Sequence, residues 1–351
     1  KNNDYDVDAA LWIGDVGISG INAVAQILVG DVNPSGSLVD TYCYDNYSAP
    51  AMWNFTPSVY DGYVEGGDVP AKGSTYMIYQ EGIYVGYKYY ETRYEDYVMG
   101  AGNAGDYAYG DIVAYPFGYG LSYTDFKFSD MTVNYNDALD VYTVAVKVTN
   151  TGAVAGKRTV QLYVQSPYTD YDKQNGVEKA AVALVGFGKT GELAPGTSEI
   201  VTMNVNKRDI ASYDTYGAGT YILDAGDYYF TAANDAHEAV NNILAAKGYT
   251  VASTNGKMTA DGDADLTYAW TEDKLDTTTY SVSENGTAIT NQLSCADPNL
   301  YDGEDNTVTW LSRSDWNGTL PTETVKLALT EQLKKDLQDI RYDPADYETM
   351  N

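Results

Sequence analysis

The chain has 351 residues, of which 44 % are hydrophobic, and this composition predicts a folded protein with two or three modest domains. Lys and Arg number 21 against 50 Asp and Glu, which gives a formal net charge of -29. Such a negative chain is a poor partner for nucleic acid or for an anionic membrane surface. No stretch approaches the roughly 20 apolar residues of a membrane span.

The residue types also limit the chemistry. His237 is the only histidine, so any catalysis away from it has to depend on carboxylates or tyrosines. Cys43 and Cys295 are far apart and outside any Cys-x-x-Cys pattern, which indicates neither a zinc site nor a disulfide framework. We therefore expect no metal and no cofactor. The 35 tyrosines suit sugar-binding surfaces, although they also suit a β-rich protein with much exposed sheet.

The first 41 residues predict an α/β unit. An apolar run at 9–13 predicts a strand, and apolar residues at helical spacing predict a helix over 21–28 that ends near Gly30. A turn over 31–36 then leads to a strand at 38–41, so we expect parallel pairing. The glycines superficially resemble a dinucleotide fingerprint, but no acidic residue is well placed for the ribose. Residues 44–110 are rich in Tyr, Gly and Asn with little regular period, and we expect functional loops.

After Phe126 the pattern changes to period two. Strands are predicted at 141–148, 159–164, 180–187, 199–205 and 228–232, which indicates a β-sandwich. One helix is predicted over 235–247, with Gly248 at its carboxyl end and His237 in its first turn as a solvated or capping residue.

The last hundred residues are predicted to hold less regular structure. Residues 251–265 are expected to form a mobile loop, and strands at 279–283 and 287–292 are expected to form a hairpin around Glu284-Asn285-Gly286. The tail, 294–351, is predicted to end in a helix over 331–341 with Thr330 as its N-cap. We expect the tail to be unable to form a domain alone.

Several blocks, in order, resemble the rear half of family-3 glycoside hydrolases. They are Leu11-Trp12-Ile13-Gly14, the turn at 30–38, Glu81-Gly82-Ile83-Tyr84-Val85-Gly86-Tyr87-Lys88-Tyr89-Tyr90 and Pro116-Phe117-Gly118-Tyr119-Gly120-Leu121-Ser122-Tyr123. The segments 148–152, 160–164, 184–187 and 193–196 are similar to the fibronectin-III-like domain that follows in that family. The tail, with Leu311-Ser312-Arg313-Ser314-Asp315-Trp316, resembles members in which the catalytic barrel follows the sandwich.

The resemblance implies an α/β plus all-β fold class. Residues 1–123 would be the C-terminal portion of an α/β sandwich domain. Residues 124–293 would be a fibronectin-III-like (immunoglobulin-like) β-sandwich with an inserted helix. Residues 294–351 would be an extended linker arm leading to a barrel.

The resemblance also implies where the chemistry lies. The family's retaining mechanism uses two carboxyl groups about 5 to 5.5 Å apart, and the resemblance places both outside this chain, so we assign no catalytic residue. Asp315 shares the letters of the nucleophile motif, but no buried apolar strand precedes it. Tyr79, Glu81 and Tyr84 are the residues we predict to contact substrate, and Glu81 is the weighed but disfavoured acid/base.

The leading hypothesis is that the chain is the non-catalytic half of a retaining β-glucosidase-like enzyme and is inactive alone. Its partners would be a β-linked sugar and the missing barrel half. One alternative is a structural module that assembles into homo-oligomers or filaments, because an unpaired strand edge would favour self-association. Another is a carbohydrate-binding module that uses the loop over 79–94. We expect a bacterial protein that is extracellular or on the cell surface rather than cytoplasmic.

Overall fold

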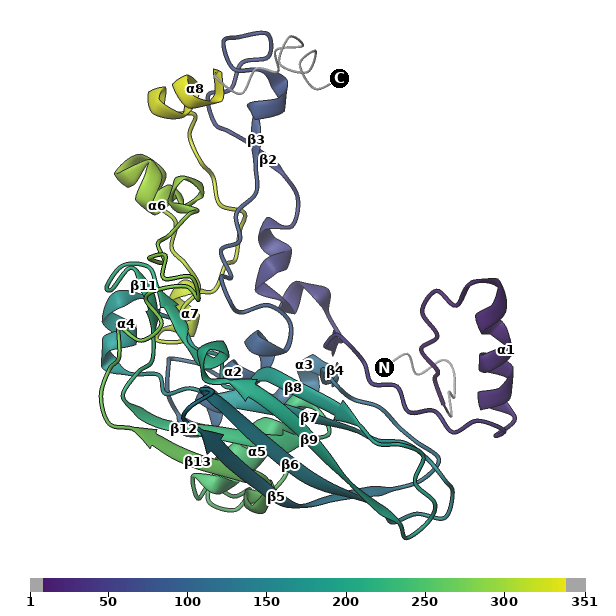
Figure 1. Cartoon of the computed structure of the whole chain (residues 1–351). Coiled ribbons are helices and arrows are strands. Elements are labelled where there is room, and N and C mark those ends of the chain that lie inside the picture. Colours follow the sequence, from purple (N-terminus) through teal and green to yellow (C-terminus); the bar gives the residue numbers. More distant parts are fainter. Residues whose placement is uncertain (1–8, 339–351) are drawn as a thin grey trace.

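The computed structural model describes residues 9–338, whose elements are labelled in Figure 1. The helices of four or more residues are α1 Gly17–Leu28, α2 Tyr87–Met99, α3 Tyr109–Ile112, α4 Asp170–Asn175, α5 Ala236–Ala246, α6 Pro298–Tyr301, α7 Trp316–Thr319 and α8 Glu331–Gln338. The strands are β1 Tyr42–Cys43, β2 Ser58–Val59, β3 Thr75–Tyr76, β4 Val113–Tyr115, β5 Phe126–Asn136, β6 Val141–Asn150, β7 Thr159–Gln165, β8 Ala183–Lys189, β9 Ser198–Asn206, β10 Ser212–Asp214, β11 Thr220–Ile222, β12 Gly226–Ala233 and β13 Thr267–Glu272.

A β-sandwich forms the centre of the molecule, as the sequence predicts. One sheet has the strand order β5-β6-β9 and the other β13-β12-β7-β8, with antiparallel pairing throughout both. Val144, Val146 and Val148 alternate along β6 and are fully buried between the sheets. All five predicted strands are present within a few residues of their expected ends. The sequence analysis did not predict β5 and β13 as strands.

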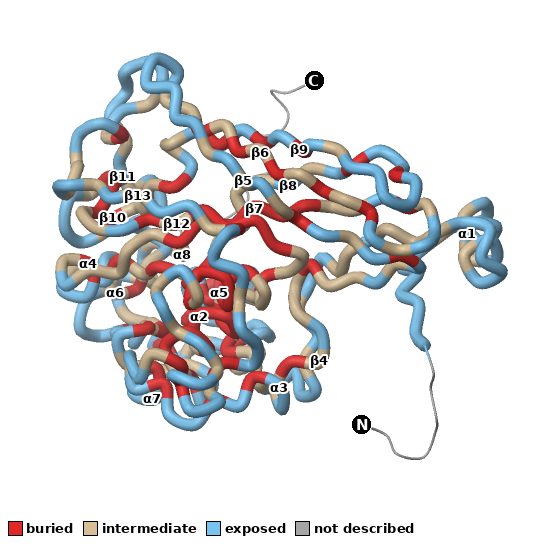
Figure 2. Tube along the Cα trace, turned by 90° about the horizontal axis from the view of Figure 1, so that it is seen from below, coloured by how far each residue is buried: buried red, intermediate tan, exposed pale blue. Residues whose placement is uncertain are grey.

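A second apolar core lies on the outer face of the four-stranded sheet. The helix predicted over 235–247 is present as α5, which packs on β12, and α2 lies beyond it (Figure 2). Residues of α2, α5, the sheet and the tail all contribute to this core. No helix was predicted at α2, where the sequence shows no clean apolar stripe. The reason is visible in the structure, because neighbours cover α2 on several sides and most of its residues are buried.

The amino-terminal α/β unit is only partly as predicted. The helix is present as α1, but the expected strands at 9–13 and 38–41 are not, and the short strand β1 pairs antiparallel with β4. No parallel sheet forms among residues 9–338, so the segments 9–13 and 38–41 have no partner strand. A strand without a partner would leave its backbone N–H and C=O groups unpaired. α1 has no buried residue and stands apart from the body of the molecule (Figures 1 and 2).

The tail runs back over the loops between β1 and α2 (Figure 1). A small core of Ile78, Val308 and Leu327 joins the two segments, and Asp61 forms a parallel bridge with Ala328. The expected hairpin near 285 is reduced to one bridge between Val282 and Ala288, because neither flank forms a strand. α8 begins as predicted, since the backbone N–H of Leu333 donates to the Thr330 hydroxyl over 3.2 Å. Its predicted end at Arg341 lies outside the described residues.

The remaining predictions concern the loop after α5, the two cysteines and membrane-spanning segments. Residues 251–265 form the expected loop, in which Met258 is buried, and the mobility of this loop stays a prediction. Both cysteines are free thiols. In the described range, no helix has the length and apolar character that a membrane crossing requires.

Candidate functional site

The three predicted substrate-binding residues lie in different environments. Tyr79 is 68 % exposed, whereas Glu81 is 4 % exposed and Tyr84 is 1 % exposed. The Tyr84 hydroxyl donates to the Glu178 carboxylate over 2.5 Å, and its ring packs edge-on against Trp316 at 4.9 Å between centroids. Burial raises the pKa of Tyr84 well above its ordinary value. Tyr84 therefore serves packing in this conformation, and Tyr79 is the one of the three with an accessible ring.

Glu81 is the one predicted acid whose environment favours a neutral carboxyl group. Burial raises its pKa, and a hydrogen bond to its own backbone partly offsets that effect. The residue sits in a turn, since the Gly82 N–H donates to Tyr79 O and the Tyr84 N–H donates to Glu81 O. Its role as a substrate contact stays a prediction.

Buried acids on α2 are the residues that the sequence analysis missed. Glu91, Glu95 and Asp96 all point into the protein, and the helix ends at Gly100, which adopts the left-handed conformation (φ 69°) that favours glycine. Gly100 was the available sequence signal for the end of this helix. The spacing of the acids on α2 did not indicate that they are buried, because their partners come from segments far along the chain.

Arg313 of the tail is the partner of two of these acids. Its guanidinium contacts Asp96 at 2.5 Å and Glu95 at 3.2 Å, and it also donates to the backbone carbonyl of Lys179. The side chain is 5 % exposed, and its charged plane lies 5.0 Å from the ring centroid of Tyr168. A buried arginine with this set of partners is held in one orientation.

The surrounding groups explain how the buried side chains of Glu95, Asp96 and Arg313 are tolerated. Burial alone would raise the pKa of Glu95, but Lys247 and Arg313 together lower it below its ordinary value. For Asp96 burial outweighs Arg313, and the pKa is raised. Asp96 also accepts a hydrogen bond from the indole N–H of Trp316 over 2.7 Å. These partners make the acids structural, because each carboxylate is engaged by a neighbour that stabilises it.

His237 differs from its prediction as a solvated or capping residue. Asp235 is the N-cap of α5, and His237 is mostly buried, with its ring stacked on Tyr109 at 3.7 Å between centroids. One ring nitrogen lies 2.8 Å from the Glu91 carboxylate and the other 2.7 Å from the Thr259 hydroxyl. The prediction was wrong because α2 and the 251–265 loop cover the first turn of α5, which the local sequence does not reveal.

A second buried ionic cluster lies beside α4. Lys179 contacts Asp224 at 2.6 Å and Asp172 at 3.4 Å, and all three side chains are buried. One oxygen of each carboxylate has no hydrogen-bond partner. Burial raises the pKa of Asp172 to about 6, although Lys179 and hydrogen bonds from Thr169 oppose that change.

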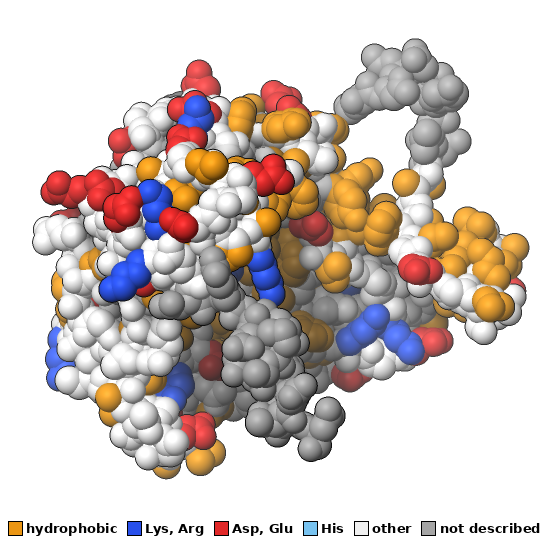
Figure 3. All heavy atoms as spheres, turned by 90° about the horizontal axis from the view of Figure 1, so that it is seen from above, with side chains coloured by type: hydrophobic (Ala, Val, Ile, Leu, Met, Phe, Trp, Pro, Cys, Tyr) orange, Lys and Arg blue, Asp and Glu red, His pale blue; other side chains and the backbone are white. Residues whose placement is uncertain are grey.

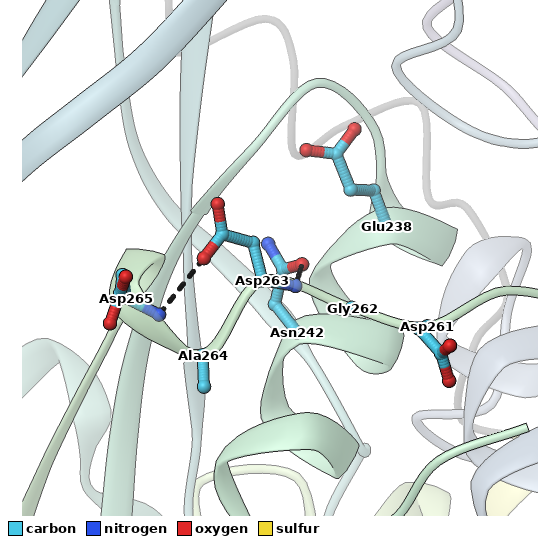
Figure 4. Close-up of a pocket in the computed structure, with 7 residues that line it drawn as sticks. All are labelled: Glu238, Asn242, Asp261, Gly262, Asp263, Ala264 and Asp265. Carbon is cyan, nitrogen blue, oxygen red and sulfur yellow. Dashed lines mark hydrogen bonds between the residues drawn. The ribbon is translucent and has the colours of Figure 1, made fainter.

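An acidic pocket of about 490 Å³ lies between α5 and the loop that follows it (Figure 4). Glu238, Asp261, Asp263 and Asp265 supply its carboxylates, but Asp261 and Asp265 extend toward opposite ends of the pocket. Asp263 caps a helical turn through the Asp265 N–H, and Asp261 accepts from a backbone N–H. No aromatic ring lines the pocket. Within residues 9–338, no group of three or more His, Cys, Asp or Glu side chains is arranged to hold a metal ion.

Asp315, the second weighed acid, has a local structural role. Its carboxylate is the N-cap of α7, accepting from the Gly318 N–H, and it also accepts from the Asn103 side chain over 2.7 Å. The motif that resembles a nucleophile motif is thus part of the segment that docks on α2.

Comparison with known proteins agrees with these features. Residues 1–87 match the glycosyl hydrolase family 3 C-terminal domain, and residues 158–236 match a fibronectin type III-like domain. Residues 1–87 carry the C-terminal domain of glycoside hydrolase family 3. The family recognised from the sequence blocks is therefore confirmed, and the β-sandwich is its fibronectin type III-like part.

Three relatives define the extent of the match. A β-glucosidase of Ruminococcus albus is 34 % identical over 68 % of this chain and 21 % of its own length. β-Glucosidase A of Butyrivibrio fibrisolvens is 36 % identical over 65 % of this chain and 25 % of its own. The crystal structure of a Kluyveromyces marxianus β-glucosidase in complex with glucose is 26 % identical, with a TM-score of 0.50 over 73 % of this chain and 23 % of that one. The chain thus spans about a fifth to a quarter of these family 3 relatives.

The Arg313 cluster predicts a large loss of stability on truncation. Arg313→Ala leaves Asp96 buried without its cation and removes one of the two cations that contact Glu95, so we expect the free energy of unfolding to fall by about 3 to 5 kcal/mol. Arg313→Lys keeps the charge but loses the two-pronged contact, and we expect an intermediate loss. Urea denaturation measures both. The control Lys147→Ala removes a surface ion pair and should cost less than about 1 kcal/mol. Equal losses for Arg313→Ala and the control would contradict the structure.

The Asp172 cluster predicts a pH dependence of known sign. Because the folded-state pKa is raised to about 6, the contribution of Asp172 to stability is complete below the unfolded pKa, near 4, and is lost as the pH rises through 6. Asp172→Asn should flatten this decline in thermal unfolding followed from pH 4 to pH 7. Asp170→Asn, an exposed neighbour in α4, is the matched control and should leave the decline unchanged. An unchanged slope in Asp172→Asn would contradict the assignment.

Proposed function

We propose that this chain is the non-catalytic part of a retaining β-glucosidase-like family 3 enzyme. It would supply the scaffold, loops at the rim of the active site and a sandwich that braces the barrel. The observation that carries the proposal is the engagement of the three buried acids of α2. Glu91, Glu95 and Asp96 are bound to His237, Lys247, Arg313 or Trp316, which leaves none of them placed as a free catalytic acid.

The chemistry of the family supports this division of labour. Retaining hydrolysis needs one carboxyl to attack the sugar and a second, at about 5 to 5.5 Å, to protonate the leaving oxygen. In the acidic pocket, Asp263 caps a helical turn, Asp261 and Asp265 extend to opposite ends, and the Glu238 carboxylate accepts from the Asn234 side chain. Relatives named β-glucosidases are four to five times longer than the aligned region, and one was solved with glucose. A β-linked sugar is therefore the proposed substrate of the parent enzyme.

We propose the same three-part division as the sequence indicates. The sandwich strands, which begin at β5, support the proposed 124–293 domain, and residues 1–123 would be the α/β portion. The arm over 294–351 would lead to the barrel, and its docking through Arg313 supports a fixed rather than a loose path. Tyr79 and Glu81 remain the proposed rim contacts, with Tyr84 packed beneath them.

The purified chain should fail to hydrolyse a chromogenic β-glucoside above the uncatalysed rate. The physical reason is that Glu91, Glu95 and Asp96 are engaged by neighbouring side chains, so that none of the three is free to act on a sugar. Glu81→Gln and Asp315→Asn are the matched variants, and the rate of the unaltered chain and of both variants should be the same. Clear turnover that Glu81→Gln or Asp315→Asn abolishes would overturn the proposal.

One observation favours a second function, assembly into oligomers. Apolar side chains of α1 and of the segments on either side of it are exposed, including Ile18 at 98 %, together with Trp12, Leu28 and Val39. Figure 3 shows hydrophobic side chains gathered on this protruding part of the molecule. An apolar helix without a covering partner is a candidate contact between copies of the chain.

Size-exclusion chromatography with light scattering tests this second function. The chain should elute as an oligomer at high concentration, and Ile18→Glu should shift it toward the monomer, because a charge on the contact face opposes burial. Leu139→Glu places the same charge at another exposed apolar residue and should have no effect. A monomer at every concentration would reject assembly.

A further inference from the structure

A cavity of about 480 Å³ lies where five separate segments of the chain meet, one of them at Lys247. Its walls come from the last turn of α2 and the following loop, from the ends of β7 and β12, and from the tail at Arg313 and Ser314. Its size falls in the usual range for small-molecule sites, and such sites occur preferentially where structural units join. Tyr79, Glu81 and Tyr84 do not line this cavity, and the family match assigns it no function.

The charges of the lining cancel. Three cations, Lys173, Lys247 and Arg313, face three carboxylates, Glu95, Asp96 and Asp227. A cavity with balanced charge offers no net attraction for a phosphate or a metal ion.

Each cation is also already bound to a carboxylate. Lys247 contacts Glu95 at 2.8 Å, and Arg313 contacts Glu95 and Asp96. Lys173 contacts Asp170 at 2.9 Å. An anion would have to compete with these ion pairs, whereas a neutral hydroxyl could accept from a cation and donate to a carboxylate without breaking a pair.

Two tyrosines give the cavity rigid aromatic walls. Lys247 lies 5.4 Å from the ring centroid of Tyr229, and Arg313 lies 5.0 Å from that of Tyr168. These contacts fix the rings next to the polar floor, and Pro167 adds a further apolar surface. A ligand with both C–H faces and many hydroxyl groups matches rings and ion pairs placed side by side.

We propose that this cavity is a binding site for a neutral sugar, either a monosaccharide or the end of a short oligosaccharide. Its C–H face packs on Tyr168 and Tyr229, and its hydroxyls bond to the ion pairs of the floor. Because Arg313 and Ser314 belong to the tail, a bound sugar also stabilises the docking of the tail on α2 and the sandwich. The proposal goes beyond hydrolysis and does not depend on it.

Ligand-observed NMR and calorimetry on the full 351-residue chain, with glucose and cellobiose as probes, test the site. We expect weak saturable binding that Tyr229→Ala reduces about tenfold, the loss of one aromatic contact. Asp227→Ala, which removes a rim carboxylate, should also weaken it. Tyr268→Ala on the neighbouring strand β13 lies outside the cavity and should bind like the unaltered chain. Inorganic phosphate should not compete.

The outcomes separate this proposal from the proposed function. Absence of binding for both sugars, equal binding by Tyr229→Ala and the control, or displacement by phosphate would each overturn the sugar site. The NMR spectra also report whether cellobiose stays intact. Cleavage of cellobiose would reject the non-catalytic role but would leave the binding comparison between variants valid.

Discussion

The buried contact between Arg313 and the two acids of α2 joins segments more than 200 residues apart in the sequence. Without it Asp96 would be buried with no cation beside it, and Glu95 would keep only Lys247. An ion pair of this kind contributes little net stability compared with apolar packing, but removing one partner is costly. It therefore specifies where the tail lies more than it adds to the overall stability.

The apolar contacts around this pair make the docking specific. Trp316 is fully buried against Tyr84 and Tyr89, and its indole N–H donates to Asp96, so one residue contributes both packing and a polar contact. The predicted sugar-contact block and the motif that resembles a nucleophile motif meet at this point. Both segments form part of the junction between α2 and the tail. The side chains of this junction therefore shape the proposed sugar cavity and also fix the path of the arm.

The distribution of buried acids also gives the chain its proposed role. Catalytic carboxyls need access to substrate and an environment that sets two pKa values apart. Glu91, Glu95 and Asp96 are instead matched with cations, hydroxyls or an indole. A chain with a net charge of -29 can hold such acids in its interior only where partners from elsewhere in the fold are provided.

The sequence by itself determined the β-sandwich, the helix α5 and the family, because alternation along β6, the apolar face of α5 and the ordered motif blocks are local features. It predicted two strands near the amino terminus that did not form, since a strand needs a neighbour to pair its backbone. Only the tertiary structure decided that α2 is a buried helix, that His237 is covered, and that Tyr84 lies in the core while Tyr79 faces solvent. These depend on contacts such as Arg313 with Asp96, whose partners are so far apart along the chain that no local pattern records them.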